Sequence, residues 1–281
     1  MIKSKKSSKS KKLRKSSKPV ADGSTGWDEY AAFYDWENAR TVGRSDIAFW
    51  RRIVQPESRA VLELGCGTGR LLMPLARACA GRGGKHAQVA GIDRSAPMLA
   101  RAVARSRRLP RADRPVIARG DIRALPFRPG TFGVVLAPYG MLQSLVRDRD
   151  LDAVLTSVAR VIRKGGLFGI DLVPDLPSWD EYRRRVSLKG RTSSGSTVTL
   201  IESVRQDRRR RLTIFDQQFV ERHGRRKTTR EFSLTFRTLP VPDIVRRLTR
   251  AGFEVEAMLG DYEGAPWHQG ADTWLILARR R

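Results

Sequence analysis

The residues whose types and spacing could do chemistry centre on a run of glycines behind an acid. Glu63 precedes Gly65, Gly67 and Gly69, which stand at alternate positions. An apolar run at 60–64 predicts a buried parallel strand before them, and a helical pattern follows them. Glycine tolerates positive φ and lets a ligand approach the backbone, and a helix start offers unpaired N–H groups and a positive dipole end. The stretch therefore predicts a ligand-binding loop, with an ordinary tight turn as the alternative.

Two further acids end the next two predicted strands, 87–93 and 116–121. Asp93 lies 24 residues beyond Gly69, close to the spacing of roughly 20 residues for an acid that binds ribose hydroxyls. A carboxylate can accept both cis hydroxyls at once. The alternative for Asp93 is a helix N-cap, but Ser95 is the better cap candidate, which leaves Asp93 free. The alternative for Asp121 is a turn aspartate.

The spacing of the glycines excludes two common nucleotide-binding loops. Arg70 stands where a dinucleotide fingerprint needs its third glycine, and no Gly-Lys-Ser/Thr ending follows. Glu-x-Gly-x-Gly-x-Gly instead resembles motif I of the class I S-adenosylmethionine (SAM)-dependent methyltransferases, over residues 27–281. The resemblance implies an α/β, doubly wound, Rossmann-like seven-stranded sheet whose seventh strand is antiparallel. It also implies SAM as cofactor and S-adenosylhomocysteine as product.

The family assigns roles to residues at the ends of the strands. Asp93 would hold the ribose, Asp121 would accept from the adenine amino group, and Ile122 would pack on the adenine ring. The expected cofactor contacts are Glu63, Gly65, Cys66, Gly67, Gly69, Asp93, Arg94, Met98, Asp121, Ile122 and Ala137. We expect no metal, because the two cysteines and three histidines show no ligand spacing.

Aromatic residues are the candidates for the acceptor pocket. Trp27, Tyr30 and Tyr34 share one face of a predicted helix, either as plain packing or as a lid over the cofactor. Tyr139 follows the fourth predicted strand, 132–138, where the family often has Asn, Asp or Ser. No catalytic residue is assigned, because methyl transfer from a sulfonium needs a general base only if the acceptor must lose a proton.

The chain divides into three predicted parts. Residues 1–18 form a disordered basic tail, 19–54 an N-terminal helical lid, and 55–281 the methyltransferase domain. Within that domain, 174–239 reads as an antiparallel β insertion with strands near 196–204, 212–220 and 228–237. The insertion resembles that of many small-molecule and sugar-modifying methyltransferases, where it caps the substrate side and can form a homodimer contact.

The charge of the chain leaves the partner open. The formal net charge is +26, and residues 1–18 contribute nine positive charges with no acid, which predicts a weak contact with a polyanion. The main hypothesis is a methyltransferase acting on a small molecule. The alternatives are a nucleic-acid methyltransferase that uses the tail, and a module that only binds SAM. No Asn-Pro-Pro-Tyr-type motif or RNA-binding module supports the former.

The expected location is the cytoplasm. Two cysteines without a disulfide pattern suit a reducing compartment, and no apolar run approaches the length of a membrane span.

Overall fold

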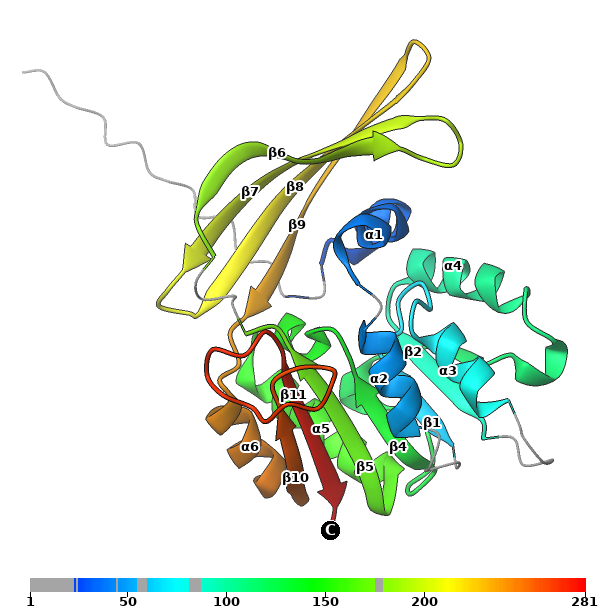
Figure 1. Cartoon of the computed structure of the whole chain (residues 1–281), viewed down its shortest axis with the longest axis vertical. Coiled ribbons are helices and arrows are strands. Elements are labelled where there is room, and N and C mark those ends of the chain that lie inside the picture. Colours follow the sequence, from blue (N-terminus) through cyan, green and yellow to red (C-terminus); the bar gives the residue numbers. More distant parts are fainter. Residues whose placement is uncertain (1–22, 24, 44, 55–59, 81–86, 175–178) are drawn as a thin grey trace, which may run out of the picture.

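The structure is a computed structural model that describes residues 23, 25–43, 45–54, 60–80, 87–174 and 179–281. The predicted tail, 1–18, lies outside these residues. Figure 1 shows a seven-stranded sheet flanked by helices and a separate four-stranded sheet above one end of it. Helix α1 lies between the small sheet and α4. In the part of the chain that the structure describes, no helix is long and apolar enough to cross a membrane.

The large sheet has the order β10-β11-β5-β4-β1-β2-β3. Strands β1 to β5 pair in parallel, and β11 pairs antiparallel with both β5 and β10. This confirms the predicted fold, including the antiparallel seventh strand. The strands are β1 Val61–Leu64, β2 Val89–Asp93, β3 Val116–Arg119, β4 Phe132–Ala137, β5 Ile162–Leu172, β10 Phe253–Leu259 and β11 Trp274–Arg280.

Helices cover both faces of this sheet, because its central strands are apolar on both sides. Helices α2 (Ser45–Val54), α3 (Leu72–Cys79) and α4 (Ala96–Ser106) bury one face in a cluster that includes Trp50. Helices α5 (Asp148–Val161) and α6 (Val241–Arg250) bury the other face in a cluster that includes Phe168. Among the described residues, short 3₁₀ turns complete the connections: η2 Arg111–Asp113, η3 Ile122–Ala124 and η4 Met141–Ser144.

The end of α5 differs from the sequence prediction. The pattern predicted a helix from 151 to 163, ended by the Lys164-Gly165-Gly166 segment. The helix ends at Val161, and Ile162 already pairs with Phe132 of β4. Gly165 then takes a φ of +68°, and the β4–β5 register shifts beside it. Burial of Ile162 on the sheet therefore outweighs the tendency of residues 162–163 to continue the helix.

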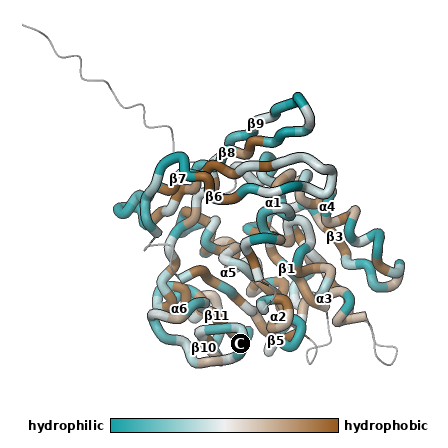
Figure 2. Tube along the Cα trace, turned by 45° about the horizontal axis from the view of Figure 1, so that its top comes forward, coloured by the Kyte–Doolittle hydropathy of each residue, from teal (hydrophilic) through white to brown (hydrophobic). Residues whose placement is uncertain are grey.

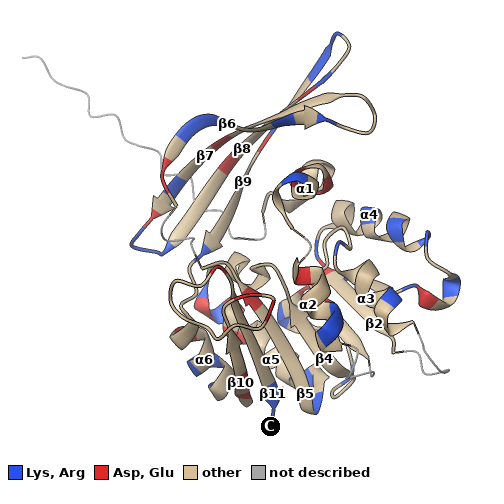
Figure 3. Ribbon diagram, viewed as in Figure 1, with Lys and Arg blue, Asp and Glu red and all other residues tan. Residues whose placement is uncertain are grey.

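The insertion is one strand larger than predicted. Its four antiparallel strands are β6 Tyr182–Arg191, β7 Thr197–Asp207, β8 Leu212–His223 and β9 Arg226–Arg237. Three of these were predicted, and the turn between β8 and β9 falls at Gly224, which has a φ of +56°. The sequence did not predict β6 because most of its side chains are exposed and many are cationic, so it shows no apolar alternation. Figure 3 shows Lys and Arg along β6 and at the β8–β9 tip, and Figure 2 shows the hydrophilic character of that tip.

Helix α1 (Trp27–Thr41) joins the two sheets. Phe33 stacks on Phe219 of β8 with ring centroids 4.2 Å apart. On the opposite side, Asp35 accepts a hydrogen bond from Thr68 Oγ1 at 2.7 Å and pairs with Arg105 of α4 at 2.9 Å. The helix is therefore anchored both to the insertion and to the loop that follows β1.

Candidate functional site

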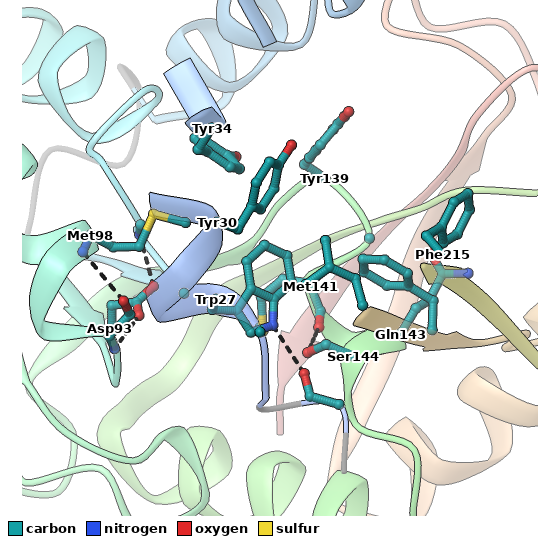
Figure 4. A pocket seen from close by; sticks show the side chains of 18 of the residues that line it. Trp27, Tyr30, Tyr34, Asp93, Met98, Tyr139, Met141, Gln143, Ser144 and Phe215 are labelled. Atoms are coloured by element: carbon teal, nitrogen blue, oxygen red, sulfur yellow. Dashed lines mark hydrogen bonds between the residues drawn. The ribbon is translucent and has the colours of Figure 1, made fainter. Parts of the chain in front are cut away.

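One cavity of about 970 Å³ lies between the two sheets. We call its lower side the sheet wall, formed by lining residues between 63 and 150 at the carboxyl ends of the strands. We call its upper side the roof, formed by lining residues of 27–41 and 179–237. Figure 4 shows aromatic side chains gathered between Asp93 and Phe215, which mark the two sides.

The glycine loop has the backbone that its sequence predicted. Gly65, Gly67 and Gly69 have φ values of +63°, +52° and +79°, a region in which a side chain would be strained. Gly65 and Gly67 line the cavity together with Cys66. The thiol of Cys66 is buried against β2, and this burial raises its pKa. The loop therefore turns its backbone, and not the sulfur, toward a ligand.

Glu63 is the most unusual carboxylate of the sheet wall. Only 3% of the residue is exposed, and among the described residues Oε2 has no hydrogen-bond partner. Burial raises the pKa of Glu63 to about 8, although the nearby Arg70 opposes this shift. A buried carboxylate without a partner is costly, and a cationic ligand would relieve that cost.

Asp93 is not the N-cap, as predicted, but its carboxylate is engaged by backbone N–H groups. Its two carboxylate oxygens accept from the backbone N–H groups of Gly67 and Ser95, each at 2.8 Å. Ser95 is the N-cap, as predicted, and accepts from Met98 N at 3.3 Å. Burial raises the pKa of Asp93, while these N–H groups oppose the shift. Asp93 therefore holds the glycine loop against the start of α4, and its carboxylate, with about four acceptor positions, keeps capacity for a ligand hydroxyl.

Asp121 has a local role close to the turn alternative. It caps η3 by accepting from Arg123 N at 2.9 Å, and Arg123 Nε lies 3.0 Å from both of its oxygens. This contact with Arg123 holds the pKa of Asp121 below its usual range. Arg123 also pairs with Asp150 at 3.0 Å. A ligand amino group at Asp121 would therefore share a carboxylate that is already engaged.

The cavity brings most of the predicted site residues together. The predicted residues that line it are Glu63, Gly65, Cys66, Gly67, Asp93, Arg94, Met98, Asp121, Ile122, Tyr30, Tyr34 and Tyr139. Gly69 and Ala137 are not among its lining residues. A Cβ on Gly69 would lie 2.8 Å from the Met73 methyl group, so this glycine faces a helix. Ala137 is fully buried in the core.

The predicted aromatic residues close the middle of the cavity. Tyr30 and Tyr34 meet edge to face, with centroids 5.3 Å apart. Tyr139 has a φ of +53° and is 42% exposed. The Arg70 guanidinium lies 5.3 Å from the Tyr139 ring centroid, and it also pairs with Asp46 of α2. Arg70, at the position of the missing third glycine, thus packs against Tyr139, a candidate residue of the acceptor pocket.

Sequence reasoning missed three polar residues of the roof. Glu37 accepts from Tyr30 Oη at 2.9 Å, and burial raises its pKa to about 7. Glu202 of β7 and Gln217 of β8 are cross-strand partners on the inner face of the small sheet. Glu37 continues the helical stripe of Trp27, Tyr30 and Tyr34, which was the signal available in the sequence.

A further missed pair lies beside the sheet wall. Asp171, near the end of β5, accepts from Tyr262 Oη at 2.7 Å and is 2% exposed. Burial raises the pKa of Asp171 to about 6. Because 91 residues separate the two partners, no local pattern in the sequence indicates the contact. It ties the loop before β11 to the central sheet.

No metal centre is visible in the described ranges, where His, Cys, Asp and Glu do not gather in groups of three or more that could hold an ion.

Comparison with known proteins identifies the domain. Residues 61–166, from β1 to the start of β5, match the family model described as a methyltransferase domain. Residues 61–166 carry a methyltransferase domain. The predicted resemblance to the class I SAM-dependent methyltransferases is thereby confirmed for this domain and for the fold.

Individual relatives extend the similarity beyond the domain. A demethylmenaquinone methyltransferase of Lactiplantibacillus plantarum is 37% identical over 50% of this chain and 57% of its own length. The chain thus spans about half the length of the quinone methyltransferases it matches. The cypemycin N-terminal methyltransferase of a Streptomyces species is 26% identical over 88% of this chain and 94% of its own. The CcbJ methyltransferase structure from Streptomyces caelestis superposes with a TM-score of 0.71 and 19% identity, over 92% and 99% of the two chains.

Proposed function

We propose that this chain transfers a methyl group from SAM to a small-molecule acceptor by direct displacement. The observation that carries the proposal is the position of two carboxylates at the glycine loop. Glu63 precedes the loop, and its Oε2 has no partner among the described residues. Asp93 accepts a hydrogen bond from Gly67 of the loop. These two carboxylates suit the two ends of one ligand, a cationic amino group and a pair of ribose hydroxyls. The match of residues 61–166 to a methyltransferase domain supports the same conclusion.

The sheet wall has the chemistry that such a cofactor needs. Glu63 would neutralise the ammonium of its methionine part, the loop backbone at Gly65 and Gly67 would lie against it, and Asp93 would accept from the ribose. Ile122 is 9% exposed and lines the cavity beside Asp121, so it offers an apolar surface for a purine ring. The predicted contacts of Arg94 and Met98 belong to the same proposal.

When bound, SAM supplies a methyl group that its sulfonium has already activated. The protein then has to align the acceptor with that methyl group and exclude water. The aromatic residues of the roof and Tyr139 surround the space beyond the glycine loop, and the anchoring of α1 through Asp35 keeps them in place. We keep the predicted lid role of α1 as part of this proposal.

The acceptor is proposed at the level of a small molecule. The relatives are named for acceptors as different as demethylmenaquinone and the N-terminus of cypemycin. A duplex or long single strand is a poorer fit, because the acids Glu37 and Glu202 face the space that would take the acceptor. Contact of residues 1–18 with a polyanion and pairing of two copies through the insertion remain predictions.

Two measurements test the proposal. Isothermal titration calorimetry with SAM should give one site with an affinity in the micromolar range. Incubation with methyl-labelled SAM and a pool of small metabolites, followed by mass spectrometry, should reveal a labelled product. Absence of binding at millimolar SAM would refute the cofactor assignment. Binding without any labelled product would leave a module that only binds SAM, as in the alternative stated above.

A further inference from the structure

The charges that line the cavity are divided by wall. Within the described residues, the cations that line it are Arg70, Arg94, Arg119 and Arg123, and all four belong to the sheet wall. Every charged residue that the roof contributes is acidic: Asp28, Glu29, Glu37 and Glu202. This contrast stands out in a chain with 55 Lys and Arg against 29 Asp and Glu. The roof therefore differs in charge from the molecule as a whole.

Two of these acids lie deep in the roof and act on each other. Glu202 is 7% exposed, and its proximity helps to raise the pKa of Glu37. Glu202 accepts from Tyr182 Oη, from Ser187 Oγ at 3.3 Å and from Gln217 Nε2 at 3.0 Å. A carboxylate has about four acceptor positions, so Glu202 keeps capacity for one more donor. Glu37 accepts a side-chain hydrogen bond from Tyr30 Oη alone among the residues that the structure describes.

Gln217 adds an independent observation. The residue is 6% exposed and lines the cavity. Because a carboxylate can only accept, Gln217 must turn its amide nitrogen toward Glu202, which fixes the position of its oxygen. That oxygen, Oε1, has no hydrogen-bond donor in the described part of the chain. A buried acceptor without a donor is costly, so a ligand that brings N–H groups would restore the lost bond.

We propose that the roof binds an acceptor through a protonated amine, held by Glu37, Glu202 and Gln217 Oε1, and that this amine nitrogen is the atom methylated. An ammonium brings three donors and one positive charge, which matches two carboxylates and one amide oxygen. Tyr30, Trp27 and Phe215 add aromatic surface beside these acceptors, and aromatic faces attract cations. The inference rests on the proposed function, since it names the acceptor class for the same cavity.

The chemical step then balances. The bound ammonium, R–NH₃⁺, passes one proton to the Glu37 carboxylate and leaves a neutral amine, which rotates so that its lone pair points toward the sulfonium methyl group. That lone pair forms the new N–C bond to the methyl group while the C–S bond breaks. The bonding pair stays on sulfur, which becomes a neutral thioether, and the product is R–NH₂⁺–CH₃. Glu37 acts as the base, and Glu202 and Gln217 position the nitrogen.

A matched pair of probe sets tests the inference. Primary amines graded from ethylamine through phenethylamine to tryptamine are titrated calorimetrically into the protein saturated with S-adenosylhomocysteine. The alcohols with the same carbon skeletons are titrated in parallel. At least one amine should bind ten times more tightly than its alcohol or better. Glu37→Gln, Glu202→Gln and Gln217→Leu should each lower that ratio at least threefold, whereas Glu231→Gln, an exposed charge on the same sheet, should leave it unchanged.

The outcomes separate this inference from the proposed function. Loss of S-adenosylhomocysteine and SAM binding in the wild-type protein would refute the proposed function itself. Intact cofactor binding with no amine preferred over its alcohol would overturn the amine assignment alone. Equal amine preference in wild type and Glu37→Gln, with cofactor binding as the check that the variant is folded, would also overturn it. Glu37→Gln that binds amines weakly and methylates them slowly at every pH would support it.

Discussion

The sheet wall and the roof differ in how far apart in the chain their residues lie. Glu63, the glycines and Asp93 fall within 31 residues, and hydrogen bonds between the loop and the start of α4 fix their geometry. Glu37 and Glu202 are 165 residues apart in the chain and meet only because α1 packs on the small sheet. Local contacts build the sheet wall, whereas long-range packing builds the roof. The two can therefore change independently, and damage to each should have a different effect.

The largest expected effect comes from breaking the roof alone. Phe219 is fully buried and stacks on Phe33, so Phe219→Ala removes a ring from the contact between α1 and the insertion. A substitution of this type costs about 3–5 kcal/mol, and we expect much of that cost to fall on the roof. Activity on a small acceptor should fall by about several hundredfold, while SAM binding in calorimetry changes little. Equal loss of both would show that the two walls are coupled.

The second prediction ranks the two acids of the sheet wall. Asp93→Ala should weaken SAM binding by about 100-fold, because it removes hydrogen bonds to a charged group worth about 1.5–3 kcal/mol each. Asp121→Ala should cost less than tenfold, because Arg123 already occupies that carboxylate. Calorimetry with both variants measures the difference. A larger effect at Asp121 would reverse our assignment of the main anchor.

The third prediction uses pH to report on Glu63. Its folded pKa of about 8 lies above the ordinary value of 4.5, so the folded state holds the proton more tightly than the unfolded chain. The resulting stability is complete below pH 4.5 and is lost as the pH rises through 8. Between pH 4.5 and pH 8, the melting temperature of the wild-type protein without cofactor should fall relative to that of Glu63→Gln. The expected fall is a few °C, on the order of the shifts seen for domains of this size. Saturating SAM should reduce the difference. A difference in melting temperature between the two proteins that stays the same at all pH values would argue against a buried, unpaired Glu63.

The smallest effect is expected from the tail, which belongs to neither wall. Deleting residues 1–18 removes nine positive charges, and affinity for single-stranded RNA should become weaker and less dependent on salt. Activity on a small acceptor should change less than twofold. Filter binding at several salt concentrations, beside a standard activity assay, measures both. A large loss of small-molecule activity would place the tail in the cavity.

The sequence predicted the sheet wall better than the roof for a physical reason. Glycine at positive φ and an acid at a strand end are demanded by local backbone geometry, so Glu63, Gly65, Gly67 and Asp93 could be found from spacing alone. Asp93 was nevertheless described as free, because its hydrogen bonds to Gly67 and Ser95 depend on how the strands align. The roles of Glu202 and Gln217 were missed because cross-strand pairing decides which of their neighbours they meet.

A crystal structure with bound S-adenosylhomocysteine tests the central claim most directly. The account predicts that the amino group of the ligand lies within hydrogen-bond distance of Glu63 Oε2 and that both ribose hydroxyls reach Asp93. It also predicts that the sulfur atom faces the roof, toward Glu37 and Tyr30. A ligand bound elsewhere, or one that leaves Glu63 Oε2 without a partner, would contradict the account.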